Sequence, residues 1–222
     1  MRSGCGCFDR CVRCRCDAFR NDCRREQLLE RGAMISADKA QRPPDLQVRQ
    51  WFNTEKPITL AALHGKVVAI EAFQMLCPGC ITHGIPQAQR IHATFPKSQV
   101  AVIGLHTVFE HHAAMEPVSL QAFLFEYGIN FPVAVDAAGE NDPTPKTMQA
   151  WGQRGTPTLW LLDRSGRLRS AHLGQVHDMV VGAEIATLIC EQDSPAAQPL
   201  SDDHDTSGAC RPTREIDESA RK

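Results

Sequence analysis

The chain has 222 residues, 42% of them hydrophobic, and a formal net charge of -2 from 24 basic and 26 acidic side chains. This length suits one globular domain with some additional unstructured length, and the near-neutral charge argues against a nucleic-acid-binding or membrane-binding surface. No apolar run approaches the roughly 20 residues that span a bilayer, and residues 1–50 lack the apolar core of roughly 7 to 15 residues that a secretory signal requires. We therefore expect a cytoplasmic protein with no nucleic-acid and no membrane partner.

Residues 1–45 form a first region that is rich in arginine and cysteine, has little periodic apolar pattern and ends near the breaker "RPPD". Six of the ten cysteines lie here: Cys5, Cys7, Cys11, Cys14, Cys16 and Cys23. The composition predicts a poorly ordered leader. Two interpretations of its cysteines remain open. One is a small zinc cluster, although two separated C-x2-C knuckles are missing; the other is a translated stretch upstream of Met34 as the natural first residue.

The first strongly apolar run is "KVVAI", residues 66–70, whose β-branched residues predict a strand buried on both faces of a parallel sheet. Directly after it, the stretch "EAFQMLCPGCITHGIPQAQR" contains Cys77 and Cys80, separated by two residues. A helix is then predicted over residues 85–95, because apolar residues recur there at helical spacing. A close cysteine pair in a chain that is not a disulfide scaffold is usually catalytic or metal-binding.

Further elements follow in an alternating order. Residues 100–105 ("VAVIGL") predict a second strand, and a helix is expected to begin with a cap at Ser119 and to end at Gly128. Residues 131–136 ("FPVAVD") predict a third strand. The order is that of a βαβ arrangement.

The last part of the domain is predicted to be a hairpin and a helix. The stretch "TPTLWLLDRSGRLRSAHLG" indicates two antiparallel strands turned by Arg164, Ser165 and Gly166, and "DMVVGAEIATLICEQ" indicates the closing helix. Together these elements predict an α/β domain over residues 46–192 with a central mixed sheet covered by helices on both faces. Residues 193–222 are polar and rich in breakers, which predicts a disordered tail.

This order of elements, with Cys-x-x-Cys at the end of the first long strand, resembles the thioredoxin fold, and in particular the TlpA-like and AhpC/TSA-like redoxins. Leu60, Leu63, Gly65 and Lys66 resemble the Leu-x-x-Leu-x-Gly-Lys stretch that precedes the active-site strand in that branch. The segment "GTPTLWLLDRSGRL" resembles its Gly-Thr-Pro, strand and Asp-x-x-Gly turn. The resemblance covers residues 46–192 and implies a three-layer thioredoxin-like fold that performs thiol–disulfide chemistry.

The chemistry of such a site explains the residues between and around the sulfurs. Cys77 at a helix N-terminus would face unpaired N–H groups that favour its thiolate, so we expect a lowered pKa and the role of attacking sulfur. Cys80, one turn deeper, would be the shielded resolving thiol. Pro78 suits the first helical turn, and Gly79 leaves room for a docking substrate.

The resemblance also implies supporting residues. Glu71 matches the position of the buried acid of thioredoxins, so we expect its pKa to be raised by burial and its carboxylate to act as the base for Cys80; the alternative is an exposed glutamate. Pro157 matches the cis-proline that faces the two sulfurs, and it would hold the backbone of Thr156 for pairing with an incoming substrate.

The sequence departs from the family pattern in two places. Met75 and Leu76 stand where a tryptophan usually precedes the first cysteine, which predicts a flatter and more apolar lip. The helix proline, Pro86, comes one residue later than usual, so a kink is expected around Gly84.

Several other residues have competing interpretations. His106, His111 and His112 are interpreted as solvated histidines rather than metal ligands. His83 is interpreted as a surface residue, with tuning of Cys77 by its positive charge as the alternative. Cys190 is predicted to be a buried apolar filler. Trp151 and Trp160 are predicted to be core or near-site aromatics.

The sequence therefore predicts a thiol–disulfide oxidoreductase that needs no cofactor and no metal. Its expected partners are protein or small-molecule disulfides and an unidentified electron donor. One alternative is a thiol peroxidase of peroxiredoxin type acting on peroxides, but the Pro-x3-Thr-x2-Cys arrangement is missing before Cys77. The other is a Sco-like copper-binding protein, a family that spaces its two cysteines by three residues instead of two.

Overall fold

The computed structural model describes residues 34–140 and 143–191. The predicted leader up to residue 33, with its zinc interpretation, and the predicted tail lie outside the described residues. The described strands are β1 (Val48–Phe52), β2 (Val67–Phe73), β3 (Val100–His106), β4 (Val133–Asp136), β5 (Thr158–Leu162) and β6 (Leu168–Leu173). The helices are α2 (Ile85–Thr94), α3 (Pro117–Glu126), α4 (Lys146–Ala150) and α5 (Asp178–Cys190), with short 3-10 turns η1 (Ala61–Leu63) and η3 (His112–Ala114) and a π-helical turn η2 (Cys80–Gly84).

The six strands form one mixed sheet in the order β1-β4-β3-β2-β5-β6. The pairs β2–β3 and β3–β4 are parallel, whereas β1–β4, β2–β5 and β5–β6 are antiparallel. β2 lies in the centre, and all seven of its residues are buried. Apart from Glu71, its residues are apolar, as a strand covered on both faces requires.

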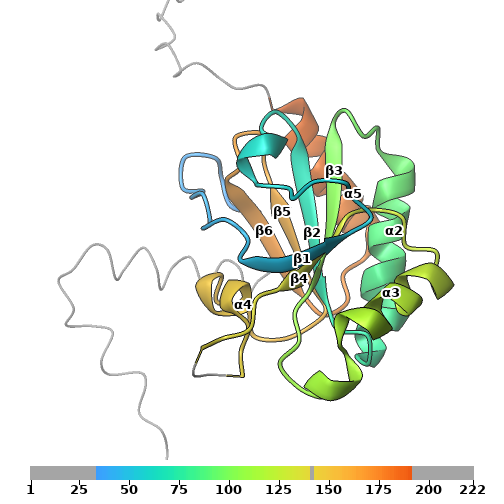
Figure 1. Cartoon of the computed structure of the whole chain (residues 1–222). Coiled ribbons are helices and arrows are strands. Elements are labelled where there is room, and N and C mark those ends of the chain that lie inside the picture. Colours follow the sequence, from blue (N-terminus) through green and yellow to red (C-terminus); the bar gives the residue numbers. More distant parts are fainter. Residues whose placement is uncertain (1–33, 141–142, 192–222) are drawn as a thin grey trace, which may run out of the picture.

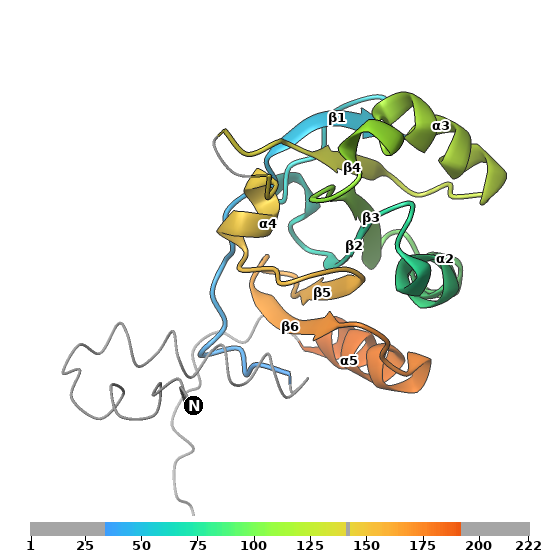
Figure 2. The same cartoon turned by 90° about the horizontal axis from the view of Figure 1, so that it is seen from below.

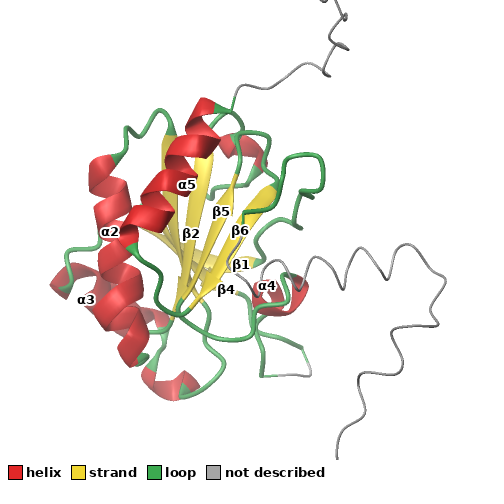
Figure 3. Cartoon of the chain, turned by 180° about the vertical axis from the view of Figure 1, so that it is seen from behind, coloured by secondary structure: helices red, strands yellow, loops and turns green. Residues whose placement is uncertain are grey.

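Helices and loops cover both faces of the sheet. In Figure 2, where the sheet is seen nearly end-on, α2, α3 and α5 lie on one side and α4 on the other, and Figure 3 shows α5 crossing in front of the strands. Phe73, Ile85 and Leu188 belong to the core under the three long helices, whereas Ile70 and Trp160 belong to the core on the opposite face. The predicted α/β, three-layer fold is confirmed.

The boundaries predicted from the sequence hold within a few residues, with three differences. α3 begins at Pro117 with Glu116 at its N-cap, not at Ser119, because a proline at N1 loses no helical hydrogen bond. The strand β1 and the short helix α4 were not predicted (Figure 1). No helix among the described residues is long and apolar enough to cross a membrane.

A buried carboxylate holds α4 in place. Asp136, at the end of β4, accepts hydrogen bonds from the backbone N–H groups of Thr147 at 2.9 Å and Met148 at 3.1 Å, and from the Thr107 hydroxyl at 3.0 Å. These are the N–H groups that a helix start leaves unpaired. A helix of five residues is therefore fixed by a side chain from the sheet and not by its own propensity.

Residues before the predicted domain boundary at 46 pack on the last two strands. Ile35 is buried, and its N–H and C=O pair with Arg169, while the Gln41 carbonyl accepts from the Leu168 N–H at 2.9 Å. The ordered domain thus includes residues 34–45, which the sequence assigned to the leader.

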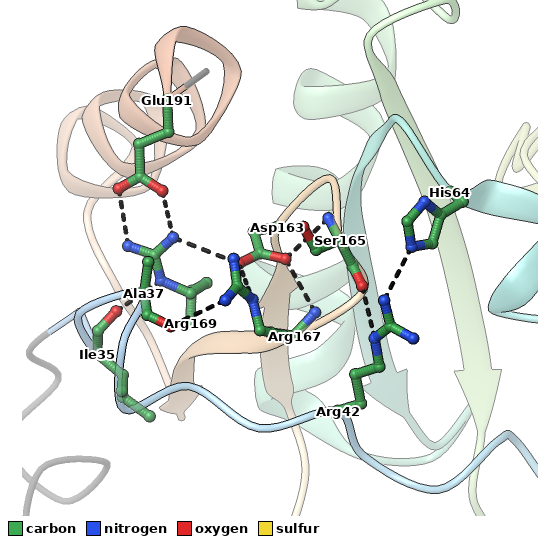
Figure 4. A network of polar contacts seen from close by, with 9 residues as sticks. All are labelled: Ile35, Ala37, Arg42, His64, Asp163, Ser165, Arg167, Arg169 and Glu191. Atoms are coloured by element: carbon green, nitrogen blue, oxygen red, sulfur yellow. Dashed lines mark hydrogen bonds and ion pairs between the residues drawn. The ribbon is translucent and has the colours of Figure 1, made fainter. Parts of the chain in front are cut away.

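The side chain of Arg169 connects this segment to the end of α5 (Figure 4). Its Nε donates to the Ile35 carbonyl at 2.6 Å, and its two terminal nitrogens bind the carboxylate of Glu191, one of them at 2.8 Å. Nη1 also reaches Asp163 at 3.5 Å. These partners satisfy a guanidinium that is almost completely buried, and the hydrogen bond to Glu191 is the largest factor that raises the pKa of Arg169.

We expect Arg169→Leu to lower the free energy of unfolding by about 3 to 5 kcal/mol, because the carboxylates of Glu191 and Asp163 lose a buried partner. Arg49→Leu is the matched control, since it removes an arginine whose ion pair with Glu116 is about half exposed and is worth about 0 to 1 kcal/mol. Urea denaturation of both variants measures the difference. Equal losses would contradict a structural role for the Arg169 network.

Candidate active site

The two cysteines lie where the chain leaves the central strand β2 and turns into the helical segment. The Gln74 carbonyl accepts a hydrogen bond from the Cys77 N–H at 3.3 Å, which closes the turn, and the Cys77 carbonyl accepts from the Ile81 N–H at 3.2 Å. Helical conformation starts at Pro78. Cys77 therefore occupies the N-cap position, as predicted, and Pro78 lies in the first turn.

The two sulfurs differ in burial. Both thiols are free, with Cys77 half-buried and Cys80 buried. The Cys77 sulfur receives the backbone N–H of Cys80 at 3.3 Å and lies 3.6 Å from the carbonyl oxygen of Thr156. One accessible and one shielded sulfur, close in the chain, is the arrangement that dithiol–disulfide exchange requires.

Burial raises the pKa of Cys80, and its hydrogen bond with the Cys77 side chain adds to that rise. Two groups act in the opposite direction: the backbone of Gln74 and the side chain of Thr156 both hydrogen-bond to Cys80 and lower its pKa. Thr156 therefore acts on both cysteines: its carbonyl oxygen lies 3.6 Å from the Cys77 sulfur, and its side chain lowers the pKa of Cys80. The second effect was not predicted, because nothing in the sequence pattern fixes where the Thr156 side chain points.

The peptide bond between Thr156 and Pro157 is cis, as the resemblance implied. Gly79 lies against this proline, and a Cβ added at Gly79 would lie 3.2 Å from Pro157 Cδ. The glycine was expected to leave room for a substrate. In the structure, the absence of a side chain on this glycine also lets the turn between the two cysteines pack on Pro157.

Glu71 is buried at 2% exposure, so the alternative of an exposed glutamate is wrong. Its side chain points to the face of β2 that α2 and α5 cover, since it shares that face with Ala69 and Phe73. Its Oε1 has no hydrogen-bond partner, and burial raises the pKa of Glu71 to about 8. Such a group holds a proton at neutral pH and can release it.

The departure from the family pattern at the helix proline has a structural cause. The chain forms a π-helical turn over Cys80–Gly84, in which the Ile85 N–H donates to the Cys80 carbonyl, before regular helix α2 starts. A π-turn accommodates one extra residue. The kink expected around Gly84 is this turn, and the extra residue delays Pro86 by one position.

Gly84 is a site residue that sequence analysis did not identify as such. A Cβ at this position would lie 2.2 Å from Glu71 Oε1 and 2.8 Å from Pro157 Cβ, distances that no real side chain tolerates. The only signal in the sequence was the displaced proline, which showed an irregularity without showing what it touches.

The lip in front of Cys77 is narrower than predicted. Leu76 is 57% exposed, whereas Met75 is buried in the core. Leu173 is also exposed, and its side chain lies 3.7 Å from the position of a Cβ on Gly155, next to Thr156. The apolar surface near the cysteines therefore includes Leu76 and Leu173, and not Met75.

Other predictions need correction. His106 is not solvated: it is fully buried against Phe73, both ring nitrogens lack partners, and burial lowers its pKa to about 4. Cys190 is exposed and not a core filler, because it is the last residue of α5 and lies off the buried face. For Trp151 and Trp160 the core alternative is confirmed: Trp160 is buried on the sheet face opposite to Glu71, and the partly buried Trp151 packs on it.

The other three histidines singled out from the sequence lie at the surface. His83, His111 and His112 are exposed. Within residues 34–140 and 143–191, no group of three or more His, Cys, Asp or Glu side chains is arranged to hold a metal ion.

We expect the free energy of unfolding to fall as pH rises from 6.5 to 8, by about 2 kcal/mol. Native Glu71 keeps its proton up to a pKa of about 8, far above its ordinary value of 4.5, whereas the unfolded chain has already lost it. His106 contributes in the opposite direction until about pH 7.5, because in the unfolded chain it is still half protonated at pH 6.5, but the control variant keeps His106, so this contribution cancels in the comparison. Denaturant titrations at several pH values measure the slope.

The matched control is Glu71→Gln, in a background where Cys77 and Cys80 are serine so that thiols do not titrate. This variant should show no such slope over the same pH range. An equal slope with and without the carboxyl would show that Glu71 titrates normally.

The comparisons with known proteins agree with this geometry. The profile of the AhpC/TSA family matches residues 40–171. Among curated proteins, DipZ of Mycobacterium tuberculosis is 31% identical over 135 residues, which is 60% of this chain and 18% of DipZ. The thiol-disulfide oxidoreductase ResA of Halalkalibacterium halodurans is 27% identical over 125 residues, 56% of this chain and 63% of ResA. The chain thus spans less than two thirds of these relatives.

Solved structures match over nearly their whole length. A crystal structure of a thioredoxin-like superfamily protein is 58% identical with a TM-score of 0.68, and the match covers 69% of this chain and 99% of that one. A thiol-disulfide isomerase from Corynebacterium glutamicum is 48% identical with a TM-score of 0.67, over 70% of this chain and 99% of that one. With a profile match over more than half of its length, this chain belongs to the AhpC/TSA family and has a thioredoxin-like fold.

Proposed function

We propose that this protein is a thiol–disulfide oxidoreductase in which Cys77 and Cys80 exchange a dithiol for a disulfide. The observation that carries the proposal is the asymmetric sulfur pair beside the cis-proline, with Cys77 half-buried at a helix start and Cys80 buried behind it. The names of ResA and of the Corynebacterium isomerase point to the same class of activity.

The reaction follows from the placement of the two sulfurs. The Cys77 thiolate attacks a disulfide of the partner, forms a mixed disulfide and releases one partner sulfur. Cys80 then loses its proton and attacks the Cys77 sulfur, which releases the second partner thiol and leaves a Cys77–Cys80 disulfide. Two electrons pass from this protein to the partner, and an electron donor restores the dithiol. The reverse sequence oxidises a partner dithiol.

Supporting residues have separate tasks in this proposal. Thr156 and Pro157 present the backbone along which an extended partner pairs, and the Thr156 side chain hydrogen-bonds to Cys80. Glu71, once it has released its own proton, is the base that takes the Cys80 proton. Glu71 is not among the groups that act on the Cys80 thiol, which are Cys77, Gln74 and Thr156, so this proposal includes a water molecule that carries the proton between Cys80 and Glu71. Partners are protein or small-molecule disulfides, and a cytoplasmic location stays a prediction.

Neither alternative function is favoured by a specific contact. A peroxidase needs donors that bind the peroxide oxygens, but the group facing Cys77 from Thr156 is a carbonyl, which only accepts. For a copper carrier, the two cysteines would need a further ligand, and the described residues gather no third one.

We expect Cys77→Ser to abolish reduction of a protein disulfide such as insulin, whereas Cys80→Ser should still attack and should accumulate a mixed disulfide that mass spectrometry detects. Cys190→Ser is the matched control, because it removes an exposed thiol far from the pair in sequence and should leave the rate unchanged. Hydrogen peroxide consumption is followed on the same samples. Fast consumption that depends on Cys77 alone would replace this function with a peroxidase.

We expect Thr156→Val to prolong the mixed disulfide about tenfold, because Cys80 loses a hydrogen bond that lowers its pKa. The lifetime is measured by stopped-flow release of a chromogenic thiol. Thr82→Val is the matched control, since its hydroxyl donates to the Pro78 carbonyl at 2.9 Å in the same turn. If both variants release the thiol at the wild-type rate, the Thr156 side chain has no part in the second step.

A further inference from the structure

A polar cavity of about 150 Å³ lies between α2 and the loop that leads from β6 to α5. Glu71 is its most buried charged residue. The π-turn and α2 contribute His83, Gly84, Gln87 and Arg90, and residues 174–178 form the other wall. Neither sulfur lines the cavity, and neither does Thr156 or Pro157. Glu71 therefore borders a space that is separate from the place where a partner meets Cys77.

The π-turn explains why Glu71 borders this cavity. Gly84 is the residue of the turn that lies against Glu71 Oε1, and any side chain there would overlap the carboxyl group. With glycine, the helix backbone passes close to Glu71 without covering it. The one extra residue between Cys80 and Pro86 thus places a gap in the helix surface beside the acid.

The rim of the cavity is polar and held open by specific contacts. Gln87 Nε2 donates to the Val176 carbonyl at 2.9 Å and to Asp178 at 2.8 Å. The Arg90 guanidinium binds both carboxylate oxygens of Asp178, at 2.7 and 3.0 Å, and both side chains are about half exposed. The charged or titratable groups around Glu71 on this side are His83, Arg90, His177 and Asp178, all of which water reaches.

We propose that this cavity is a water-filled route by which Glu71 exchanges its proton with bulk solvent, and that the π-turn with glycine at position 84 opens it. The volume is sufficient for several waters of about 30 Å³ each. The Glu71 carboxyl group, which is buried and lines the cavity, supplies the polar group that such water needs. A carboxyl group that holds a proton at neutral pH has a use for such a route.

The role of the route in the reaction rests on the proposed function. Glu71, which holds a proton at neutral pH, first releases it through the cavity to solvent. The carboxylate then takes the proton of Cys80, and the Cys80 thiolate donates its electron pair to the Cys77 sulfur as the partner thiolate leaves. Glu71 is then protonated while the partner still covers the sulfurs. The cavity lets that proton leave to solvent on a side that the partner does not cover, and in the reverse direction it delivers one.

The test measures proton exchange at Glu71 directly, in the oxidised full-length protein, where Cys77 and Cys80 cannot titrate. Glutamate side chains are labelled with ¹³C, and Glu71→Gln assigns the Glu71 carboxyl signal. At the pH where Glu71 is half protonated, rapid exchange with solvent gives one averaged signal and slow exchange gives two. We expect one signal in the wild type.

Two variants close the cavity from the loop without touching Glu71: Gln175→Trp, at an exposed lining position, and Val176→Phe, at a half-buried one. We expect at least one of them to split or strongly broaden the Glu71 signal. Met179→Trp is the matched control, because Met179 is 87% exposed, lies nearby in the chain and does not line the cavity. A single sharp signal in all three variants would overturn the proposed route.

Turnover of the same variants separates this inference from the proposed function. Slow exchange together with slower release of the partner thiol supports both. Slow exchange with normal release supports the route and shows that Glu71 is not the base for Cys80. If wild-type protein has no disulfide exchange activity but the Glu71 signal still splits in the closed variants, the function fails and the proton route stands.

Discussion

The helical segment that carries the two cysteines packs closely against the central strand and against the cis-proline. The geometry of the site depends on this contact. Two glycines, Gly79 and Gly84, lie against Pro157, and Gly84 also lies against Glu71. A β-carbon at Gly84 would force either the acid or the proline to move. Because the helix start holds both sulfurs, this contact fixes where Cys77 and Cys80 lie relative to Thr156 and to the buried acid.

The same core holds two titratable groups whose pKa values burial shifts toward the neutral form. Glu71 pairs with Gly104 in the sheet, and His106 pairs with Phe73, so the two side chains come from adjacent strands and point to the same face. Burial raises the pKa of Glu71 to about 8 and lowers that of His106 to about 4. Near neutral pH both are uncharged, so the core beneath the helices carries no unpaired charge there. Acid places a charge in this core by protonating His106, and alkali does so by deprotonating Glu71.

Most of the sheet could be predicted from the sequence because β2, β3 and β5 are continuously apolar and buried, and such runs leave few alternatives. β1 could not, since "VRQWF" lies at the sheet edge and mixes exposed and half-buried residues without clean alternation. α4 could not be predicted either, because the side chain that caps it, Asp136, lies well before the N-cap position in the chain. Residues 34–45 are ordered through Arg169, a contact across more than a hundred residues that local pattern cannot show.

In the candidate site, the sequence predicted residue types and order, but not the contacts that depend on helix register. Cys77, Cys80, the cis Pro157 and the burial of Glu71 follow from the motif and its resemblance to redoxins. The close approach of Gly84 to Glu71 follows from the π-turn, which only the delayed Pro86 hinted at. One inserted residue changes which side of the helix faces the acid, and pattern matching treats such an insertion as a small irregularity. Its structural effect is large because it occurs where helix, strand and cis-proline meet.

That insertion places sulfur exchange and proton exchange, as proposed above, at two separate surfaces of the protein. Cys77 lies on the side bordered by Thr156, Leu76 and Leu173, where a partner docks in the proposed function. Glu71 faces the cavity rimmed by Gln87, Arg90 and Asp178. A β-carbon at position 84 would overlap the Glu71 carboxyl group on that second side. Glycine avoids this overlap, so the partner can exclude water from the sulfurs while Glu71 stays in contact with it.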